Sequence, residues 1–236
     1  MKKSKGSIQI PALDRGLDLI EWFARQSEPA TLTQIAQGLS LNVSEVQRPV
    51  ACLHARGYLN RSSSAAYLIS GKIVDLAQAL PVHFKLRQAA HGPMAVFART
   101  CGESIHLSVP DGDAALLLLD VPGGSLVRLS LQEGARLDPA RTVSGRILLA
   151  HGAICNPESR KLEPTVLARI RKLGYESARS FQVEGITDTG VPVRNGDGKV
   201  VAALAISCLK MKGSSKSAKT LLKGLLLCAE TISDGI

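Results

Sequence analysis

The amino-acid sequence predicts an α+β protein with a small helical N-terminal part, a linking helix and a larger C-terminal part that contains an antiparallel sheet. Three observations lead to this fold class. Apolar residues recur at helical spacing in three segments before residue 58. The amphipathic segment GKIVDLAQAL (71–80) follows them. From Glu103 onward, three β-prone runs are separated by the turn sequences PDGD and PGG.

The chain is long enough, at 236 residues with 45% hydrophobic residues, for two modest domains with packed cores. Its net charge of +9 favours a polyanionic partner such as DNA. Residues 1–80 carry nine Lys and Arg against six Asp and Glu, so the excess is not concentrated there. Aromatic residues make up only 3%, which argues against a surface for single-stranded nucleic acid.

The five cysteines form no C-x-x-C pair, so we expect neither a disulfide framework nor a metal site. No signal peptide or membrane span is evident, and we expect a cytoplasmic protein that does not bind membranes. The five histidines are scattered, and no G-x-S-x-G, H-E-x-x-H or phosphate-loop sequence occurs. The sequence therefore predicts no enzyme, no catalytic residue and no cofactor.

Three helices are expected at the N-terminus. The first follows Pro11, with a buried stripe of Leu13, Leu17, Ile20 and Ala24. The second opens at Thr31, which forms a capping box with Gln34, and buries Ile35, Ala36 and Leu39. The third starts near Asn42, which forms a capping box with Glu45, and buries Val46, Val50 and Leu53.

The outer side of the third helix has side chains suited to reading DNA. It carries Ser44, Gln47, Arg48 and Ala51, and Gln and Arg are the residues that recognise adenine and guanine edges. Two short β-prone pieces, 58–61 and 67–69, then predict a hairpin whose Arg61 can meet phosphates. A short helical pair followed by a hairpin is typical of a DNA-binding unit with a wing.

Pro49 lies inside the predicted reading helix, where proline costs about 3 kcal/mol. A late helix start around Ser44 would reduce that cost. Two interpretations follow: a kinked helix that still enters the groove, or a helix with degraded specific reading. Glu45 can accept a hydrogen bond from cytosine, but we favour a role in capping the helix.

These segments resemble the IclR family of bacterial transcriptional regulators. The resemblance rests on ALDRGLDLIEWFA (12–24), on the run from Thr31 to Leu53, and on RGYL (56–59). It continues with TVSGRILLAHG (142–152) and with the stretch IRKLGYESARSFQVEGITDTGVPVRNGDGKVVAALAIS (170–207). The match runs in order along nearly the whole chain.

The resemblance implies a winged helix-turn-helix domain (1–70), a linker helix (71–88) and a GAF-like α/β effector-binding domain (89–236). It implies a repressor that binds a double-stranded DNA operator as a homodimer or tetramer and responds to a small effector, an organic or aromatic acid. The DNA-contacting candidates are Thr31, Thr33, Ser44, Glu45, Gln47, Arg48 and Arg61. The effector-binding candidates are Thr142, Ser144, Gly145, Ile186, Asp188 and Ser207.

Two of these candidates combine residue-level and family arguments. The sequence from Thr142 to Gly145 opens a helix, whose free N–H groups suit a carboxylate. Asp188 occupies a position that is commonly small or apolar in the family, and its charge favours a ligand with a donor group. Further departures from the family are Pro49, Glu45, Asn42 and a short segment between residues 150 and 170, which implies a trimmed helix.

In the C-terminal part, we expect strands over 103–109, 114–121, 125–131, 176–182, 191–194 and 199–207. Helices are expected over 142–152, 158–173 and 217–233, and a helix broken near Gly92 and Pro93 precedes the sheet. The final helix should bury Leu221, Leu225, Ala229 and Ile232. The alternative to a regulator is a ligand-binding protein whose specific DNA reading has degraded, as Pro49 and Glu45 suggest.

Overall fold

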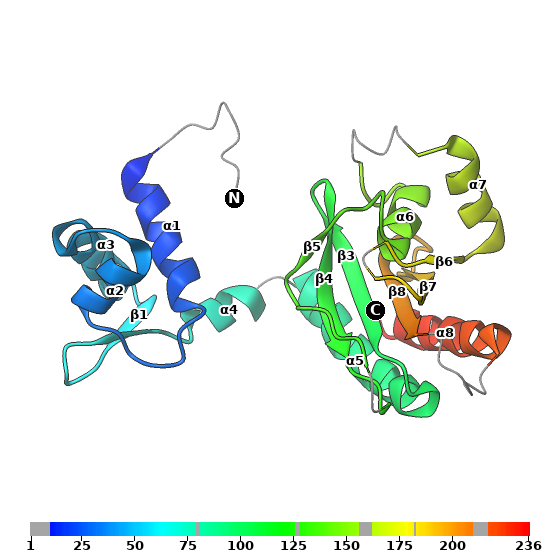
Figure 1. The fold of residues 1–236 in the computed structure, drawn as a ribbon, viewed down its shortest axis with the longest axis horizontal. Helices are drawn as coiled ribbons and strands as arrows, with labels where there is room; N and C mark the ends of the chain where they lie inside the picture. The colour runs from blue at the N-terminus through cyan, green and yellow to red at the C-terminus, as the bar shows by residue number, and fades with distance from the viewer. Residues whose placement is uncertain (1–9, 79–80, 126–127, 156–161, 182, 210–216) are drawn as a thin grey trace. The chain divides into compact units, whose positions relative to one another are not determined.

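The structure, a computed structural model, describes residues 10–78, 81–125, 128–155, 162–181, 183–209 and 217–236. The chain forms two compact units, Met1–Leu80 and Pro81–Ile236 (Figure 1). Each unit has its own hydrophobic core. The boundary between the units falls inside the segment 71–88 that was expected to link two domains.

The first unit contains three helices, a two-stranded hairpin and a short fourth helix (Figure 1). Its elements are α1 (Pro11–Phe23), α2 (Leu32–Leu39), α3 (Val43–Ala55), β1 (Leu59–Arg61), β2 (Tyr67–Ile69) and α4 (Lys72–Gln78). The predicted inner faces of α2 and α3 are confirmed, because Ile35, Ala36, Val46, Val50 and Leu53 are buried in one core. This small core fixes the outer face of α3 toward solvent.

The predicted buried stripe of α1 is wrong at Leu13, Leu17 and Ala24, whereas Ile20 is partly buried against the core. Leu13 and Leu17 are 55% and 50% exposed, whereas Leu19 and Phe23 are buried. Arg15, Leu19 and Phe23 follow each other at four-residue spacing and therefore share a helix face. Arg15 pairs with Glu45 of α3, so this face turns toward α3 and leaves the leucines outside.

The hairpin is tied to the segment between α1 and α2. β1 and β2 pair antiparallel, with Arg61 opposite Tyr67. Ala30 and Tyr67 exchange two backbone hydrogen bonds of 2.8 Å each. The predicted hairpin is therefore present, and the first residue of its second strand is tied to Ala30, just before α2.

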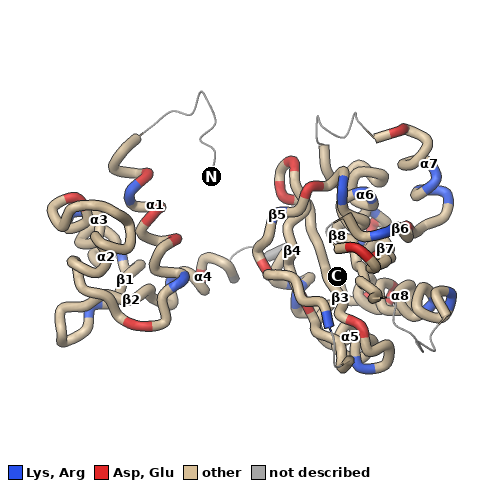
Figure 2. The backbone as a smooth tube through the Cα atoms, in the orientation of Figure 1, with Lys and Arg blue, Asp and Glu red and all other residues tan. Residues whose placement is uncertain are grey.

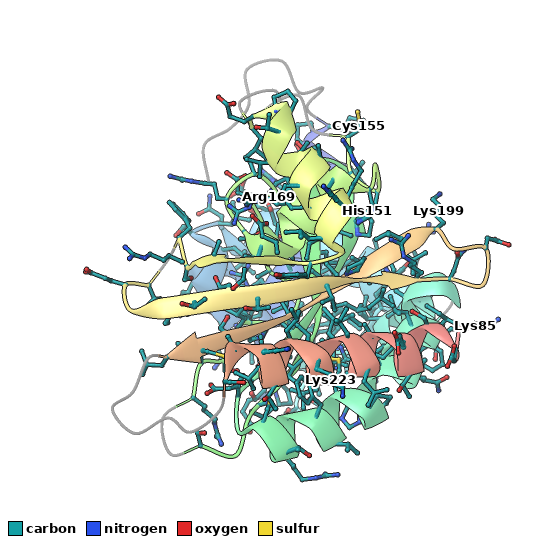
Figure 3. The ribbon with its side chains drawn as sticks, turned by 90° about the vertical axis from the view of Figure 1, so that its right-hand side faces the viewer. Lys85, His151, Cys155, Arg169, Lys199 and Lys223 are labelled. Atoms are coloured by element: carbon teal, nitrogen blue, oxygen red, sulfur yellow. The ribbon has the colours of Figure 1, made fainter. Side chains whose placement is uncertain are left out.

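The second unit is a six-stranded antiparallel sheet with helices on both faces, as Figure 3 shows with α7 on one side and α8 on the other. The strand order is β5-β4-β3-β8-β7-β6. The strands are β3 (Ile105–Asp111), β4 (Ala114–Val121), β5 (Arg136–Leu137), β6 (Glu176–Arg179), β7 (Ile186–Arg194) and β8 (Val200–Leu209). The helices are α5 (Pro81–Cys101), α6 (Val143–Ala150), α7 (Pro164–Leu173) and α8 (Ala218–Ser233).

The two faces of the sheet differ in chemistry. Large aliphatic side chains such as Leu107, Leu204 and Ile206 pack with α5 and α8 in the main core. The opposite face has small residues under α6. A Cβ atom on Gly190 would lie 2.8 Å from Val143 Cγ1 and 2.9 Å from Ile147 Cδ1, so only glycine lets α6 approach this closely.

Several expectations for this unit require correction. The described residues of 125–131 form no strand, and the edge strand is β5, because Leu129 and Leu131 line a cavity instead. The helix expected to break near Gly92 and Pro93 is continuous as α5. Its buried stripe of Leu86, Ala90, Met94 and Ala98 outweighs the proline, since each large apolar side chain contributes about 1.5–3 kcal/mol.

The remaining boundaries differ by a few residues. α7 begins at Pro164, and residues 158–161 of the expected helix 158–173 lie outside the described residues. The strand expected over 176–182 ends at Arg179, and residue 182 lies outside the described residues. β7 begins five residues before the expected 191–194 strand. The last helix is confirmed, with Leu225, Ala229 and Ile232 buried and Leu221 partly buried.

Candidate DNA interface and effector pocket

The start of α2 is fixed by Thr31, whose capping box with Gln34 is confirmed. The Thr31 backbone N–H donates to Gln34 Oε1 at 2.8 Å, and the Gln34 N–H donates to Thr31 Oγ1 at 3.4 Å. Thr33 is exposed in the first turn. After α2, Ser40 adopts a left-handed conformation and the Leu41 N–H donates to the Ala36 carbonyl at 2.9 Å. These bonds set the tight turn between α2 and α3.

The outer face of α3 is free of internal partners. Ser44, Gln47 and Arg48 are exposed on the side opposite Val46 and Val50. Within the ranges that the structure describes, no side-chain hydrogen bond involves any of these three residues. Three polar side chains at i, i+3 and i+4 spacing thus form one available surface.

Glu45 is occupied by the protein itself. Its Oε2 accepts from the Asn42 backbone N–H at 2.9 Å and from Asn42 Nδ2 at 3.2 Å. Its Oε1 accepts from Arg15 Nη2 at 2.6 Å. The Asn42 backbone bond, together with Arg15, lowers the pKa of this carboxyl group. Glu45 therefore caps α3 and attaches it to α1, in agreement with the capping role favoured from the sequence.

Pro49 lies within an unbroken α-helix. Asn42 is the N-cap, so α3 begins at Val43 and the late start around Ser44 is not adopted. Proline at position 49 cannot donate to the Glu45 carbonyl four residues back. The helix nevertheless continues to Ala55, because Val46, Val50 and Leu53 are held in the core.

The charges of the first unit are unevenly distributed. Asp14, Asp18 and Glu21 lie on α1, as the red segments there show (Figure 2). The only acid on α3 is Glu45, which Arg15 neutralises. Arg61 is exposed on β1, and its guanidinium carbon lies 5.7 Å from the centre of the Tyr67 ring. Arg48 and Arg61 are thus available to an anionic partner.

A cavity of about 190 Å³ lies on the α6 face of the sheet in the second unit. Five of the six predicted effector-binding residues line it: Thr142, Ser144, Ile186, Asp188 and Ser207. An apolar cavity of roughly 150 Å³ accommodates one benzene ring. The space is therefore suited to a single ring or a short-chain molecule.

The sixth candidate, Gly145, does not line the cavity. A Cβ atom at this position would lie 2.3 Å from Pro139 Cα and 2.7 Å from the Pro139 carbonyl oxygen. Glycine is required here because α6 packs directly against the preceding loop. Its placement indicates a packing role.

The start of α6 contributes hydrogen-bond donors to the cavity wall. Thr142 Oγ1 is occupied, since it accepts from the Gly145 N–H at 3.2 Å and donates to the Asp138 carbonyl at 3.0 Å. Val143 and Ser144 line the cavity, and their N–H groups have no intrahelical acceptor. The helix dipole also favours an anion at this end. Arg141 lines the same cavity, and its guanidinium carbon lies 3.6 Å from the centre of the Phe181 ring.

Asp188 and Ser207 form a pair across β7 and β8. Ser207 Oγ donates to Asp188 Oδ1 at 2.6 Å, and the two residues are directly opposed in the register. Ser207 therefore acts as a sheet hydroxyl that bonds a neighbouring strand. The pair still presents polar atoms to the cavity.

His106 and Ser108 on β3 also line the cavity, although neither was among the predicted residues. His106 Nδ1 lies 2.6 Å from Asp120 Oδ1, and Ser130 Oγ donates to Asp120 Oδ2 at 2.5 Å. Burial alone would raise the pKa of Asp120, but these hydrogen bonds bring it below its usual value. His106 Nε2 and Ser108 Oγ are buried without a hydrogen-bond partner among the described residues.

Other features of the second unit fit an acidic ligand less well. A hollow of about 610 Å³ between α5 and α8 is lined by residues such as Val96, Phe97 and Leu227, with no charged side chain. No cluster of three or more potential metal ligands occurs in the described part of the chain. Among the described helices, none is long and apolar enough to cross a membrane.

Comparisons with known proteins agree with this architecture. Curated relatives include the HTH-type transcriptional regulator XynR of Escherichia coli K12, 24% identical over 85% of this chain and 86% of XynR. The HTH-type transcriptional repressor AllR of Salmonella typhi is 24% identical over 83% of this chain and 79% of its own length.

Solved structures with the same fold include the IclR of Thermotoga maritima, with a TM-score of 0.71 and 22% identity over 96% of this chain and 98% of that one. An IclR homolog from Microbacterium hydrocarbonoxydans, complexed with 4-hydroxybenzoate, has a TM-score of 0.74 and 22% identity over 95% and 98% of the two chains.

Family profiles cover nearly the whole chain. Residues 12–63 match the IclR helix-turn-helix domain, and residues 78–162 and 153–234 match the C-terminal domain of bacterial IclR transcriptional regulators. The predictions of a two-part α+β regulator and of a protein that is not an enzyme are thereby confirmed. The chain belongs to the IclR family of bacterial transcriptional regulators, with a DNA-binding helix-turn-helix domain and a C-terminal effector domain.

Proposed function

We propose that this regulator represses transcription in the cytoplasm by binding an operator through the outer face of α3. Residues 1–70 would bind DNA, 71–88 would link the domains and 89–236 would bind the effector. The observation that carries the proposal is the exposed, unpaired group of Ser44, Gln47 and Arg48 on a helix positioned by a capped tight turn. Gln47 and Arg48 would read base edges, and Arg61 would contact a phosphate.

The remaining predicted DNA-contacting residues differ in whether their side chains are free to bind DNA. Thr33 is exposed at the start of α2, where a hydroxyl and helix N–H groups suit a phosphate. The Thr31 hydroxyl already donates to Gln34 Oε1 at 2.9 Å, so Thr31 would mainly hold the start of α2. Glu45 has both oxygens engaged, so it would support α3 without reading a base.

Selection from a random duplex-DNA library at near-physiological salt tests this proposal. We expect the wild type to enrich a two-fold symmetric motif, with affinity that falls steeply as salt rises. Arg48→Ala should weaken binding by about 1–3 kcal/mol and relax the preference at one base pair. The matched control, Arg25→Ala, removes the same charge from an exposed position away from α3 and should keep the preference.

A parallel selection with Pro49→Leu separates the two regulator interpretations. If only this variant enriches a motif, the proline has abolished specific reading, and the chain is a ligand-binding protein with degraded DNA recognition. The continuous α3 supports the first interpretation, in which the wild type reads its operator.

We further propose that the effector is a small organic or aromatic acid bound in the 190 Å³ cavity. The N–H groups at the start of α6 and the Arg141 guanidinium favour a carboxylate there. The 4-hydroxybenzoate complex of the homolog from Microbacterium hydrocarbonoxydans supports the ligand class. Titration of the protein–operator complex with 4-hydroxybenzoate and with short aliphatic acids tests whether an acid changes operator affinity.

A homodimer or tetramer is part of the proposal. Ile10, Leu13 and Leu17 are each at least half exposed along α1, and an exposed apolar stripe favours self-association. Light scattering coupled to size exclusion should give twice or four times the 25.0 kDa chain mass, and Leu13→Lys with Leu17→Lys should reduce it. A monomeric mass for the wild type would refute this part.

A further inference from the structure

We propose that His106 determines effector specificity by accepting a hydrogen bond from a hydroxyl group of the ligand, so that the effector is a hydroxylated carboxylic acid. The inference rests on the proposed binding of an acid in the same cavity. It adds a second group of protein atoms that would recognise the ligand, on a different element from the one that would bind the carboxylate. The first point is the start of α6, and the second is β3 in the sheet.

The hydrogen bonds around Asp120 define which nitrogen of His106 carries the proton. Asp120 Oδ2 already accepts from Ser130 Oγ, and Oδ1 lies 2.6 Å from His106 Nδ1. These bonds hold the pKa of Asp120 below its usual value despite burial, so the carboxylate is ionised and can only accept. Nδ1 must therefore donate, and in the tautomer that carries its proton on Nδ1 the opposite nitrogen, Nε2, has a lone pair that can accept a hydrogen bond.

That lone pair has no partner in the protein. His106 is 3% exposed, and its Nε2 is buried without a hydrogen bond to any described residue. Ser108, two residues along the same strand and on the same face, is 1% exposed, and its Oγ is also unpaired among the described residues. Native proteins pair the large majority of buried polar groups, so two orphaned atoms on one cavity wall indicate a place for polar ligand atoms.

The charges around the cavity assign the two ends of the ligand. A carboxylate is disfavoured near Asp188, which is an acid whose Oδ1 is already bound by Ser207. It is favoured at Val143 and Ser144, where the helix N–H groups are free of intrahelical acceptors. A hydroxyl group, in contrast, can donate to His106 Nε2 and accept a hydrogen bond from Ser108 Oγ.

The apolar part of the wall and the limited volume narrow the ligand further. Leu129, Leu137 and Ile186 line the cavity, so the body between the two polar ends is apolar or a ring. About 190 Å³ holds one ring or a short chain. The carboxylate and the hydroxyl must therefore belong to one small molecule.

Isothermal titration of the full-length protein with matched acid pairs tests this inference. The pairs are 4-hydroxybenzoate with benzoate, 3-hydroxybenzoate with benzoate, and lactate with propionate. For at least one pair, we expect the hydroxylated acid to bind the wild type at least about tenfold more tightly. In His106→Phe, which keeps a ring but removes Nε2, this preference should fall below about threefold, while the affinity for the acid without the hydroxyl changes little.

Controls separate recognition from general damage to the fold. His91→Phe makes the same substitution at an exposed position of α5 and should keep the wild-type preference. Ser108→Ala is a smaller change that should also reduce the preference, and it serves if His106→Phe does not fold. Ser130→Ala removes one of the bonds that position Asp120, at another residue of the cavity wall, and should weaken the preference less than His106→Phe.

Three results would overturn the inference. One is equal binding of both members of every pair to the wild type, as expected if a doubly protonated imidazole bound the carboxylate directly. Another is a preference that survives in His106→Phe and in Ser108→Ala. A third is the absence of binding by every acid, which would also refute the proposed effector class. A symmetric operator from the DNA selection, combined with equal binding within the pairs, would refute only the role of His106.

Discussion

Replacing Pro49 by alanine should stabilise the first unit, because it restores a hydrogen bond that α3 now lacks. Proline inside a helix is about 3 kcal/mol less favourable than alanine. Pro49 is partly buried, so truncation to alanine removes packing that we take as roughly 1 kcal/mol. The expected net gain is about 2 kcal/mol in the free energy of unfolding, or roughly 8–16 °C for a domain of this size.

Tryptophan fluorescence reports on this unit alone. Trp22 is the only tryptophan in the chain, and it packs against the core of the first unit. Urea titration of the full-length protein, followed by Trp22 emission, should show a higher midpoint for Pro49→Ala with an unchanged slope. Pro93→Ala, the matched change inside α5, should leave the Trp22 transition in place. An unchanged or lower midpoint in Pro49→Ala would show that the helix has adapted to its proline.

Three further predictions concern other contacts. Hydrogen bonds lower the pKa of Glu45 in the folded state. The stabilisation that Glu45 gives is therefore present above its pKa in the unfolded chain and is lost as the pH falls through its pKa in the folded protein. The urea midpoints of the wild type and of Glu45→Gln, followed by Trp22 emission, should converge between pH 7 and pH 3. Gly145→Ala should destabilise the second unit by about 1–3 kcal/mol in thermal unfolding, whereas Gly92→Ala, with nothing within 4 Å, should not. Burial raises the thiol pKa of Cys208 and Cys228 to about 12, so alkylation at pH 8 should modify the exposed Cys52 and Cys155 first.

The sequence predicted the local structure of the first unit well. Capping boxes at Thr31 and Asn42 and the periodicity of α2 and α3 are short-range signals, and they fixed both helix starts. The face of α1 could not be predicted in the same way. It depends on the pairing of Arg15 with Glu45, a contact between residues 30 positions apart.

The residues of the proposed effector pocket were predicted from family likeness and therefore only in part. Thr142, Asp188 and Ser207 lie on its wall, but the prediction did not include His106. A signal was present in ESIHLSV, where His and Ser alternate with Ile, Leu and Val in a predicted strand. Two polar residues on one face of such a strand require partners. The partner of His106, Asp120, lies on β4, and only the register of the sheet reveals it.

The row of small residues beneath α6 has a consequence for how such a regulator can change its ligand. Ala205 lines the cavity and pairs with His106 in the neighbouring strand, and Gly190 is next to it in β7. Added bulk at Ala205 would change the size of ligand that fits, while the hydrogen bonds around His106 and Asp120 would remain. In the proposed effector site, the size and the polarity of the ligand would thus be selected by different residues. Successive single mutations could then change the ligand without altering the sheet.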